Sequence, residues 1–271
     1  MEGFQNFNVF YWALGVFAIG LTVKNFMSLK GYKREREFAN TYSKVLRQDE
    51  DCYEAISNYV NVEKVDSLKN KGKVILAYEK MVKGEDPTEL VNTIDFKPMF
   101  YEKGRFNAKL TNRNSDIFVW LALVFAKARS LSMFDVIDKL SEKVLTYDEV
   151  LGKHLEYKLF KGLVSAIAER NDEDSAFLTK LLDGDYAGMI YEQRLIGLYK
   201  RIAASYLVYM GDTVDESFND DLRDFATTLV GKCLMTDLEI IDKYPPLEIK
   251  EEEKTEEETS EETKEENTTE E

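Results

Sequence analysis

The sequence predicts an all-α protein, with one N-terminal transmembrane helix followed by a domain of paired helices. Three observations predict it: an uncharged apolar run near the start, apolar residues that recur every three to four positions thereafter, and only 4 Pro and 14 Gly in 271 residues. A spacing of three to four is the period of a helix, whereas strands alternate every second residue. All-β proteins need turn residues every 8–12 positions or so. We therefore expect no strand.

Residues 1–30 form the predicted membrane anchor. No Asp, Glu, Lys or Arg occurs from Gly3 to Val23. The span from Val9 to Leu29 reaches the roughly 20 residues that a bilayer core requires, if the ammonium of Lys24 extends to the interface. The residues expected in the bilayer are Val9, Phe10, Tyr11, Trp12, Leu14, Val16, Phe17, Ile19, Leu21 and Val23. A cleaved signal peptide and a buried core helix are the alternatives, but the run lacks a basic start and an Ala-x-Ala site.

Charges flanking the apolar run predict its orientation. Only Glu2 precedes it, whereas Lys24, Lys30, Lys33, Arg34 and Arg36 follow closely. Lys and Arg collect on the cytoplasmic side of membrane helices. We therefore expect a single-pass protein of a bacterial cell membrane, with its N-terminus outside and its C-terminal domain in the cytoplasm.

Residues 31–61 are predicted to form a juxtamembrane helical stalk. A helix from Lys33 to Gln48 carries Phe38, Tyr42, Val45 and Leu46 on one face. This helix either continues the anchor or lies on the lipid headgroups as a basic amphipathic stretch. Asp49–Asp51 then breaks it, and a short apolar stripe follows at Cys52, Ile56, Tyr59 and Val60.

The first half of the predicted helical-repeat domain, 62–246, opens with a long helix from Val62 to Lys83 that Gly84 ends. Asp86-Pro87-Thr88-Glu89 then signals a helix start, with Asp86 as the cap and Pro87 in the first turn. The stretch Phe96–Asn114 is the least regular. It holds the aromatic residues Phe100, Tyr101 and Phe106 and five cations, and is either a functional insertion or a partly helical segment whose aromatics pack.

From Ser115 onward the helical rhythm returns. Ile117, Trp120, Leu121, Val124 and Ala128 share one face of a first helix, and Ser132 is expected to cap the next. Further helices are expected over Asp148–Ile167, about Ser175–Leu182, Ala187–Met210 (ended by Gly211) and Asp215–Met235, before Tyr244-Pro245-Pro246 closes the domain.

The helix pairs repeat at a period typical of stacked helical hairpins. Their first helices begin near Val62, Asp116, Glu149 and Ala187, at offsets of 54, 33 and 38 residues, the first of which contains the Phe96–Asn114 stretch. Ala77-Tyr78 before Gly84, and Ala204 and Tyr206 before Gly211, resemble the small/aromatic-then-Gly pattern of tetratricopeptide repeats. The resemblance implies an α-solenoid with an adaptor surface and carries over no individual site residue. An irregular helical bundle is the alternative fold.

The negative charge of the chain is concentrated at its C-terminus. Thirteen Glu and three Lys lie in the stretch 248–271, which carries −10 of the total −15. We expect 247–271 to be a disordered acidic tail, because it offers almost no apolar residue to bury. The remaining chain is mildly acidic, which argues against nucleic-acid binding, since phosphates require a basic surface.

No motif in the chain indicates catalysis, a cofactor or a metal. Phosphate-loop, dinucleotide and nucleophile-elbow patterns are absent, and His154 is the only histidine. The carboxylates at Asp172–Asp174 and Asp220-Asp221 are expected at helix starts and turns, and Asp183–Asp185 lacks the rest of a calcium loop. Cys52 and Cys233 are expected to be unpaired thiols. The helical tyrosines either line a peptide groove or are half-buried packing residues: Tyr157, Tyr191, Tyr199, Tyr206 and Tyr209.

These observations favour a membrane-tethered, non-catalytic adaptor or scaffold that binds a protein partner at the cytoplasmic face. A self-associating organiser of envelope or division assemblies is one alternative, and its oligomeric state is open. An enzyme whose site is assembled from scattered carboxylates and tyrosines is the other.

Overall fold

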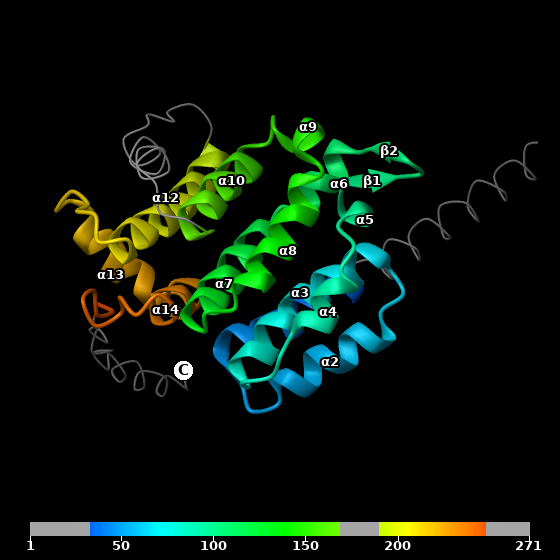
Figure 1. Cartoon of the computed structure of the whole chain (residues 1–271), viewed down its shortest axis with the longest axis horizontal. Coiled ribbons are helices and arrows are strands. Elements are labelled where there is room, and N and C mark those ends of the chain that lie inside the picture. Colours follow the sequence, from blue (N-terminus) through cyan, green and yellow to red (C-terminus); the bar gives the residue numbers. More distant parts are fainter. Residues whose placement is uncertain (1–32, 169–189, 248–271) are drawn as a thin grey trace, which may run out of the picture.

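The computed structural model describes residues 33–168 and 190–247, and in this part of the chain the predicted all-α class is confirmed (Figure 1). A helix over 33–47 comes first. It is followed by α2 (Cys52–Val62), α3 (Asp66–Val82), α4 (Thr88–Asn92), α5 (Lys97–Phe100), strands β1 (Tyr101–Glu102) and β2 (Arg105–Phe106), α6 (Ala108–Arg113), α7 (Ile117–Ser130), α8 (Phe134–Leu145), α9 (Asp148–Leu151), α10 (Leu155–Ala168), α12 (Ile190–Tyr209), α13 (Phe218–Thr227) and α14 (Leu229–Asp237).

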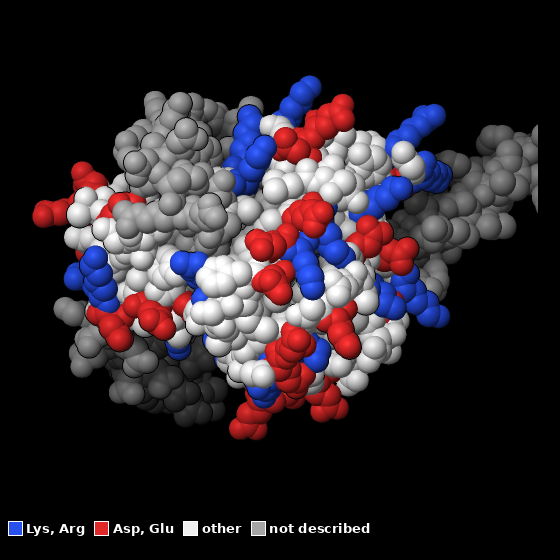
Figure 2. Space-filling model, in the orientation of Figure 1, with Lys and Arg blue, Asp and Glu red and all other residues white. Residues whose placement is uncertain are grey.

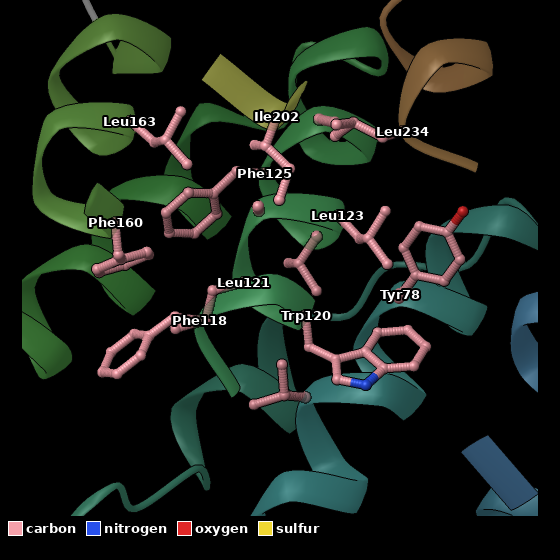
Figure 3. Packing of buried hydrophobic residues seen from close by; sticks show 14 of the residues in the cluster. Tyr78, Phe118, Trp120, Leu121, Leu123, Phe125, Phe160, Leu163, Ile202 and Leu234 are labelled. Carbon is pink, nitrogen blue, oxygen red and sulfur yellow. The ribbon is translucent and has the colours of Figure 1, made fainter. Parts of the chain in front are cut away.

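Helix α7 is the centre of the hydrophobic core. Its sequence is apolar on every face, as expected of a helix surrounded by others. It packs against α3, α8, α10 and α14. Figure 3 shows its side chains pointing to opposite sides. The ring of Phe118 lies 5.4 Å from that of Phe160 in α10, and the ring of Trp120 lies 6.1 Å from that of Tyr78 in α3.

The contacts of α7 bear on how the helix pairs are arranged. In a solenoid each repeat contacts only its neighbours along the chain. Here α3, from the start of the domain, and α14, from its end, both pack against α7. Within the described residues, α7 therefore joins helices from both ends of the domain, and the helical-hairpin arrangement stays a prediction.

The segment expected to form a stalk contributes to the same core. Phe38, Val45 and Leu46 of the helix over 33–47 are buried, as are Ile56 and Tyr59 of α2. The apolar stripes that we identified in 31–61 therefore face α3, α7 and α14 rather than solvent or lipid. The packing explains why these stripes are present in a segment that precedes the predicted domain boundary at residue 62.

Several helices end in one recurrent motif. After α3, the Gly84 N–H bonds the Met81 carbonyl and the Glu85 N–H bonds the Lys80 carbonyl, with φ of 75° at Gly84. This is a Schellman motif, and it confirms the predicted stop. The same pair of bonds surrounds Gln48, Ser132, Gly211 and Glu239, all with positive φ. The predicted role of Ser132 is thus wrong, because its backbone ends α7, and α8 begins at Phe134 without a side-chain cap.

Other predicted boundaries need correction. Val62 ends α2 instead of opening α3, since extended backbone at Glu63 and Val65 separates the two helices. The helix expected from Asp148 is divided into α9 and α10. The one expected from Asp215 is divided at Thr228, whose ψ of 151° is extended. Asp86 does accept a hydrogen bond from the Thr88 N–H at 2.9 Å, as expected of a cap.

The expectation of no strand is wrong in the Phe96–Asn114 stretch. β1 and β2 form an antiparallel hairpin, with Tyr101 opposite Phe106 and Glu102 opposite Arg105. Its two turn residues, Lys103 and Gly104, both have positive φ, as a two-residue hairpin turn requires. The hairpin and the short helices α5 and α6 form one end of the domain (Figure 1).

The predicted anchor and acidic tail lie outside the described residues, as do Lys24 and Lys30. Of the residues expected to set the topology, Lys33, Arg34 and Arg36 occupy the first turn of the helix over 33–47. Among the helices in 33–168 and 190–247, none is long and apolar enough to cross a bilayer.

Candidate functional site

An apolar groove is the main hollow that we consider as a functional site. It lies where the helix over 33–47, α12, α13 and α14 meet, and its volume is about 680 Å³. Its lining includes Tyr42, Leu46, Gly197, Leu198, Arg201 and Leu229. Leu229 is 40% exposed, whereas Leu234 and Met235 of the same helix are buried. An exposed Leu in an apolar hollow is typical of a binding surface.

The groove depends on a close approach between α13 and α14. Thr228 joins the two helices, and its hydroxyl oxygen accepts a hydrogen bond from the Gly231 N–H at 3.0 Å. A Cβ atom placed on Gly231 would lie only 2.6 Å from the Phe225 carbonyl carbon. Glycine is therefore required at 231 for α14 to turn back against α13, and this turn sets Leu229 and Val230 along one wall of the groove.

A second, smaller hollow of about 190 Å³ shares Tyr42, Leu46, Leu198 and Val230 with the groove and extends it toward α7. Its wall includes Trp120, whose ring packs edge-on against Tyr42 at 5.2 Å. The indole N–H of Trp120 has no hydrogen-bond acceptor among the described residues, and its residue is 1% exposed. Leaving such a donor unpaired costs about 1–3 kcal/mol.

Charged side chains are placed at the edges of the two hollows. Arg201 of α12 lies 2.9 Å from Asp224 and 3.6 Å from Asp221 of α13, which holds the two helices together across the groove. Beside the second hollow, Lys71 forms a 2.6 Å ion pair with Asp116, and the Lys71 side chain is only 5% exposed. A fixed polar edge around an apolar floor is the usual anatomy of a protein interface.

None of the predicted tyrosines whose side chains the structure describes lines this groove, and the side chain of Tyr191 lies outside what it describes. Tyr157, Tyr199 and Tyr206 are buried in the core, and burial raises the pKa of each hydroxyl above its usual value. Tyr209 is half-buried and accepts a hydrogen bond from Arg129 Nε at 2.9 Å. We interpreted these tyrosines either as the lining of a peptide groove or as packing residues. For those whose side chains it describes, the structure supports packing. Tyr42, which sequence reasoning placed only on an apolar face, is the tyrosine in the groove.

The carboxylates are not gathered into a reactive cluster. Asp220 and Asp221 lie in the exposed first turn of α13, as expected, whereas Asp172–Asp174 and Asp183–Asp185 lie outside the described residues. Across 33–168 and 190–247, no three His, Cys, Asp or Glu side chains are close enough together to hold a metal ion. His154 lies between α9 and α10 rather than in a helix, 5.8 Å from the Phe106 ring.

Two of the buried carboxylates, Glu79 and Asp237, hold helices together. Glu79, with 0% exposure, accepts hydrogen bonds from Gln48 Nε2 at 2.8 Å and from the Cys52 thiol at 3.2 Å. Asp237 is bonded by Tyr78 and Lys127. Each network joins segments that are distant in sequence, and neither opens into the groove. Both cysteines are free thiols, as expected.

Sequence reasoning missed the groove because four separate segments form it. Periodicity places Tyr42, Leu46 and Leu198 on apolar faces, but it does not say which apolar residues stay uncovered once the helices pack. One local signal pointed to a break in the helix that we predicted over Asp215–Met235. Thr228 is a residue that can cap a helix, and Gly231 follows it closely. Comparisons of this chain with protein-family models, with curated proteins and with solved structures found no match.

Proposed function

We propose that this protein is a membrane-tethered, non-catalytic adaptor that holds a protein partner in the groove between the helix over 33–47, α12, α13 and α14. The observation that supports it is an apolar hollow of about 680 Å³ with a half-exposed Leu229 and a charged edge. An amphipathic helix that inserts two or three apolar side chains into such a groove is a recurrent mode of recognition.

The tether rests on the sequence. An uncharged run at residues 9–23, with five cations shortly after it, predicts one membrane helix with the domain on the cytoplasmic side. The resemblance to tetratricopeptide repeats stays a prediction, and the adaptor function does not depend on it, because the groove arises from how α12, α13 and α14 pack on the first helix.

Two leucines provide a matched test of the groove. Leu229 lies in it and is 40% exposed, whereas Leu131 lies at the turn after α7, outside it, and is 44% exposed. Membranes that carry the full chain would be crosslinked and the captured proteins identified. We expect Leu229→Gln to lose a reproducible partner that Leu131→Gln retains. The proposal fails if both variants capture the same proteins in the same amounts.

A third variant fills the groove without opening the core. A Cβ on Gly197 of α12 meets no atom within 4 Å, and this residue lines the groove. Gly197→Leu should therefore fold normally and still lose the partner. If the only protein whose capture is lost in Leu229→Gln is a second copy of this chain, the groove serves self-association. The structural-organiser alternative then replaces the adaptor.

A further inference from the structure

The hairpin end of the domain carries a concentration of positive charge. The stretch from Lys97 to Arg113, which spans α5, β1, β2 and α6, holds five Lys or Arg and a single carboxylate, Glu102. Lys97, Lys103, Arg105 and Lys109 are exposed, and none of their charged groups has a carboxylate partner within the described residues. We call these four residues the basic end. Figure 2 shows Lys and Arg side chains at the side where Figure 1 draws the hairpin.

The basic end is connected through α6 to the N-terminal part of the helix over 33–47. The Arg113 guanidinium of α6 forms an ion pair with Glu35, in the first turn of the helix over 33–47. This contact brings the hairpin and α6 next to Lys33 and Arg36, which are also exposed. The ion pair thus joins two cation-bearing segments that lie more than sixty positions apart in sequence.

Three carboxylates near this surface have partners of their own, and a fourth, Asp66, lines a hollow together with Lys109 and Arg113. Glu35 pairs with Arg113, and Glu37 lies 3.8 Å from Lys33. Glu102 accepts a hydrogen bond from the Asn107 side chain at 2.7 Å. They lower the positive potential without neutralising the four cations of the basic end. The surface is therefore positive in a chain whose net charge is −15.

We propose that the basic end docks on the anionic lipid headgroups of the membrane into which the N-terminal segment inserts. The proposal rests on the proposed function, because it requires the tether. If the anchor ends at Leu29, three residues (30–32) separate it from Lys33, and these four residue steps span at most about 14 Å when extended. That length keeps the start of the helix over 33–47 within about two Debye lengths of the membrane surface at physiological ionic strength, where one Debye length is about 8 Å.

The tether already holds the domain at the membrane surface, so docking of the basic end costs little additional entropy. Each Lys or Arg near an anionic membrane changes the binding equilibrium by about fivefold. Lys103 and Arg105 flank the hairpin tip, and Lys109 follows on α6, so several cations can reach the headgroups together. The acidic tail is the competing occupant within this chain, but it follows α14, which lies at the other end of the domain in Figure 1.

The test uses the full chain in lipid nanodiscs, with a fluorophore beside the basic end. Ala108 is exposed, and Ala108→Cys offers a reactive thiol, whereas Cys52 is buried and Cys233 half-buried. Energy transfer from this label to headgroup-labelled lipid would be compared in neutral discs and in discs with about one-third phosphatidylglycerol. We expect higher transfer in the anionic discs, and its loss at high salt, since screening shortens the Debye length to a few ångströms.

Charge-reversal variants identify the residues responsible. Lys103→Glu with Arg105→Glu should abolish the difference between anionic and neutral discs. The matched control, Lys232→Glu with Lys243→Glu, changes the net charge equally on exposed positions in and after α14, and should preserve it. Equal transfer in both kinds of disc overturns the proposal. So does high transfer that appears only when residues 248–271 are deleted, whatever the lipid, because the tail then governs this surface.

Failure of the tether would be recognised separately. Alkaline carbonate washing of cell membranes tests whether the full chain is integral, without reference to lipid charge. A chain released by the wash refutes the tether and the docking together. A chain that is retained, but whose label ignores lipid charge, refutes the docking alone and leaves the adaptor proposal standing.

Discussion

The hydroxyl of Tyr78 in α3 donates a hydrogen bond to Asp237 Oδ2 in α14 over 3.0 Å, across 159 positions of sequence. The ammonium of Lys127 in α7 lies 3.1 Å from the other carboxylate oxygen. Three helices from the start, middle and end of the domain therefore meet at one carboxylate, whose side chain is only 5% exposed. Tyr78, Lys127 and Asp237 thus connect α3, α7 and α14.

Removing the hydroxyl of Tyr78 should destabilise the domain. Tyr78→Phe leaves the aromatic packing in place but deprives a buried carboxylate of a donor, which costs about 1–3 kcal/mol. Tyr53→Phe is the control, because the Tyr53 hydroxyl bonds the exposed Glu85 at 2.9 Å, where water can replace it. Urea unfolding of the full chain would measure both. Equal midpoints for the two variants would contradict a structural role for the Tyr78 bond.

Asp237 should make stability depend on pH. Burial raises the pKa of Asp237 above its usual value, although Lys127 and Tyr78 act in the opposite direction. A carboxyl whose pKa is higher in the folded state stabilises the fold at low pH, and this contribution is lost as the pH rises through the folded pKa. We expect Asp237→Asn to gain stability relative to the natural chain between about pH 4 and pH 7. A constant difference between the two chains over that range would show that burial does not dominate.

The two cysteines should resist alkylation until the domain unfolds. Burial, helped by the hydrogen bond to Glu79, raises the pKa of Cys52 to about 11, and burial also raises the pKa of Cys233. The thiolate is the reactive form, and little of it is present near neutral pH. Iodoacetamide should label neither thiol in the folded chain and both in urea, as read by mass spectrometry. Ala108→Cys would serve as the exposed reference thiol.

The features that could be predicted from the sequence are those that the spacing of neighbouring residues determines. The apolar face of the helix over 33–47, the stop at Gly84 and the helix expected from Ile117 each depend on about a dozen consecutive residues. Contacts that join distant segments were out of reach, including the Arg113–Glu35 pair, the Tyr78–Asp237 bond and the groove itself. The hairpin was missed because each strand is two residues long, which is too short for an alternating pattern, although Lys103-Gly104 suits a two-residue turn.

Helix ends without glycine offer a direct test of the Schellman motif. Ser132 has φ of 57°, a conformation in which a side chain is strained, whereas Gly84 has 75° in the same motif. Ser132→Gly should therefore stabilise the domain by up to about 1 kcal/mol, and Gly84→Ala should destabilise it by a similar amount. Thermal unfolding of both variants beside the natural chain would measure this. Opposite shifts support the assignment, and a loss of stability on Ser132→Gly would contradict it.

Two glycines that line or support the groove should respond oppositely to a methyl group. At Gly231 the added carbon would meet the Phe225 backbone and ring, the latter at 2.9 Å, so α13 and α14 would have to separate. Overpacking of this kind costs about 1–3 kcal/mol. At Gly197 the carbon meets nothing within 4 Å, and alanine favours a helix over glycine by about 0.5–1 kcal/mol.

We therefore expect Gly231→Ala to lower the unfolding midpoint and Gly197→Ala to maintain or raise it. Partner capture would then distinguish a change in the shape of the groove from a change in a direct contact with the partner. Gly231→Ala should lose the partner because the wall formed by Leu229 and Val230 moves, whereas Gly197→Ala adds one methyl to an intact groove and should weaken capture only slightly. If Gly231→Ala retained both stability and partner, the close approach of α13 and α14 would not be what shapes the groove.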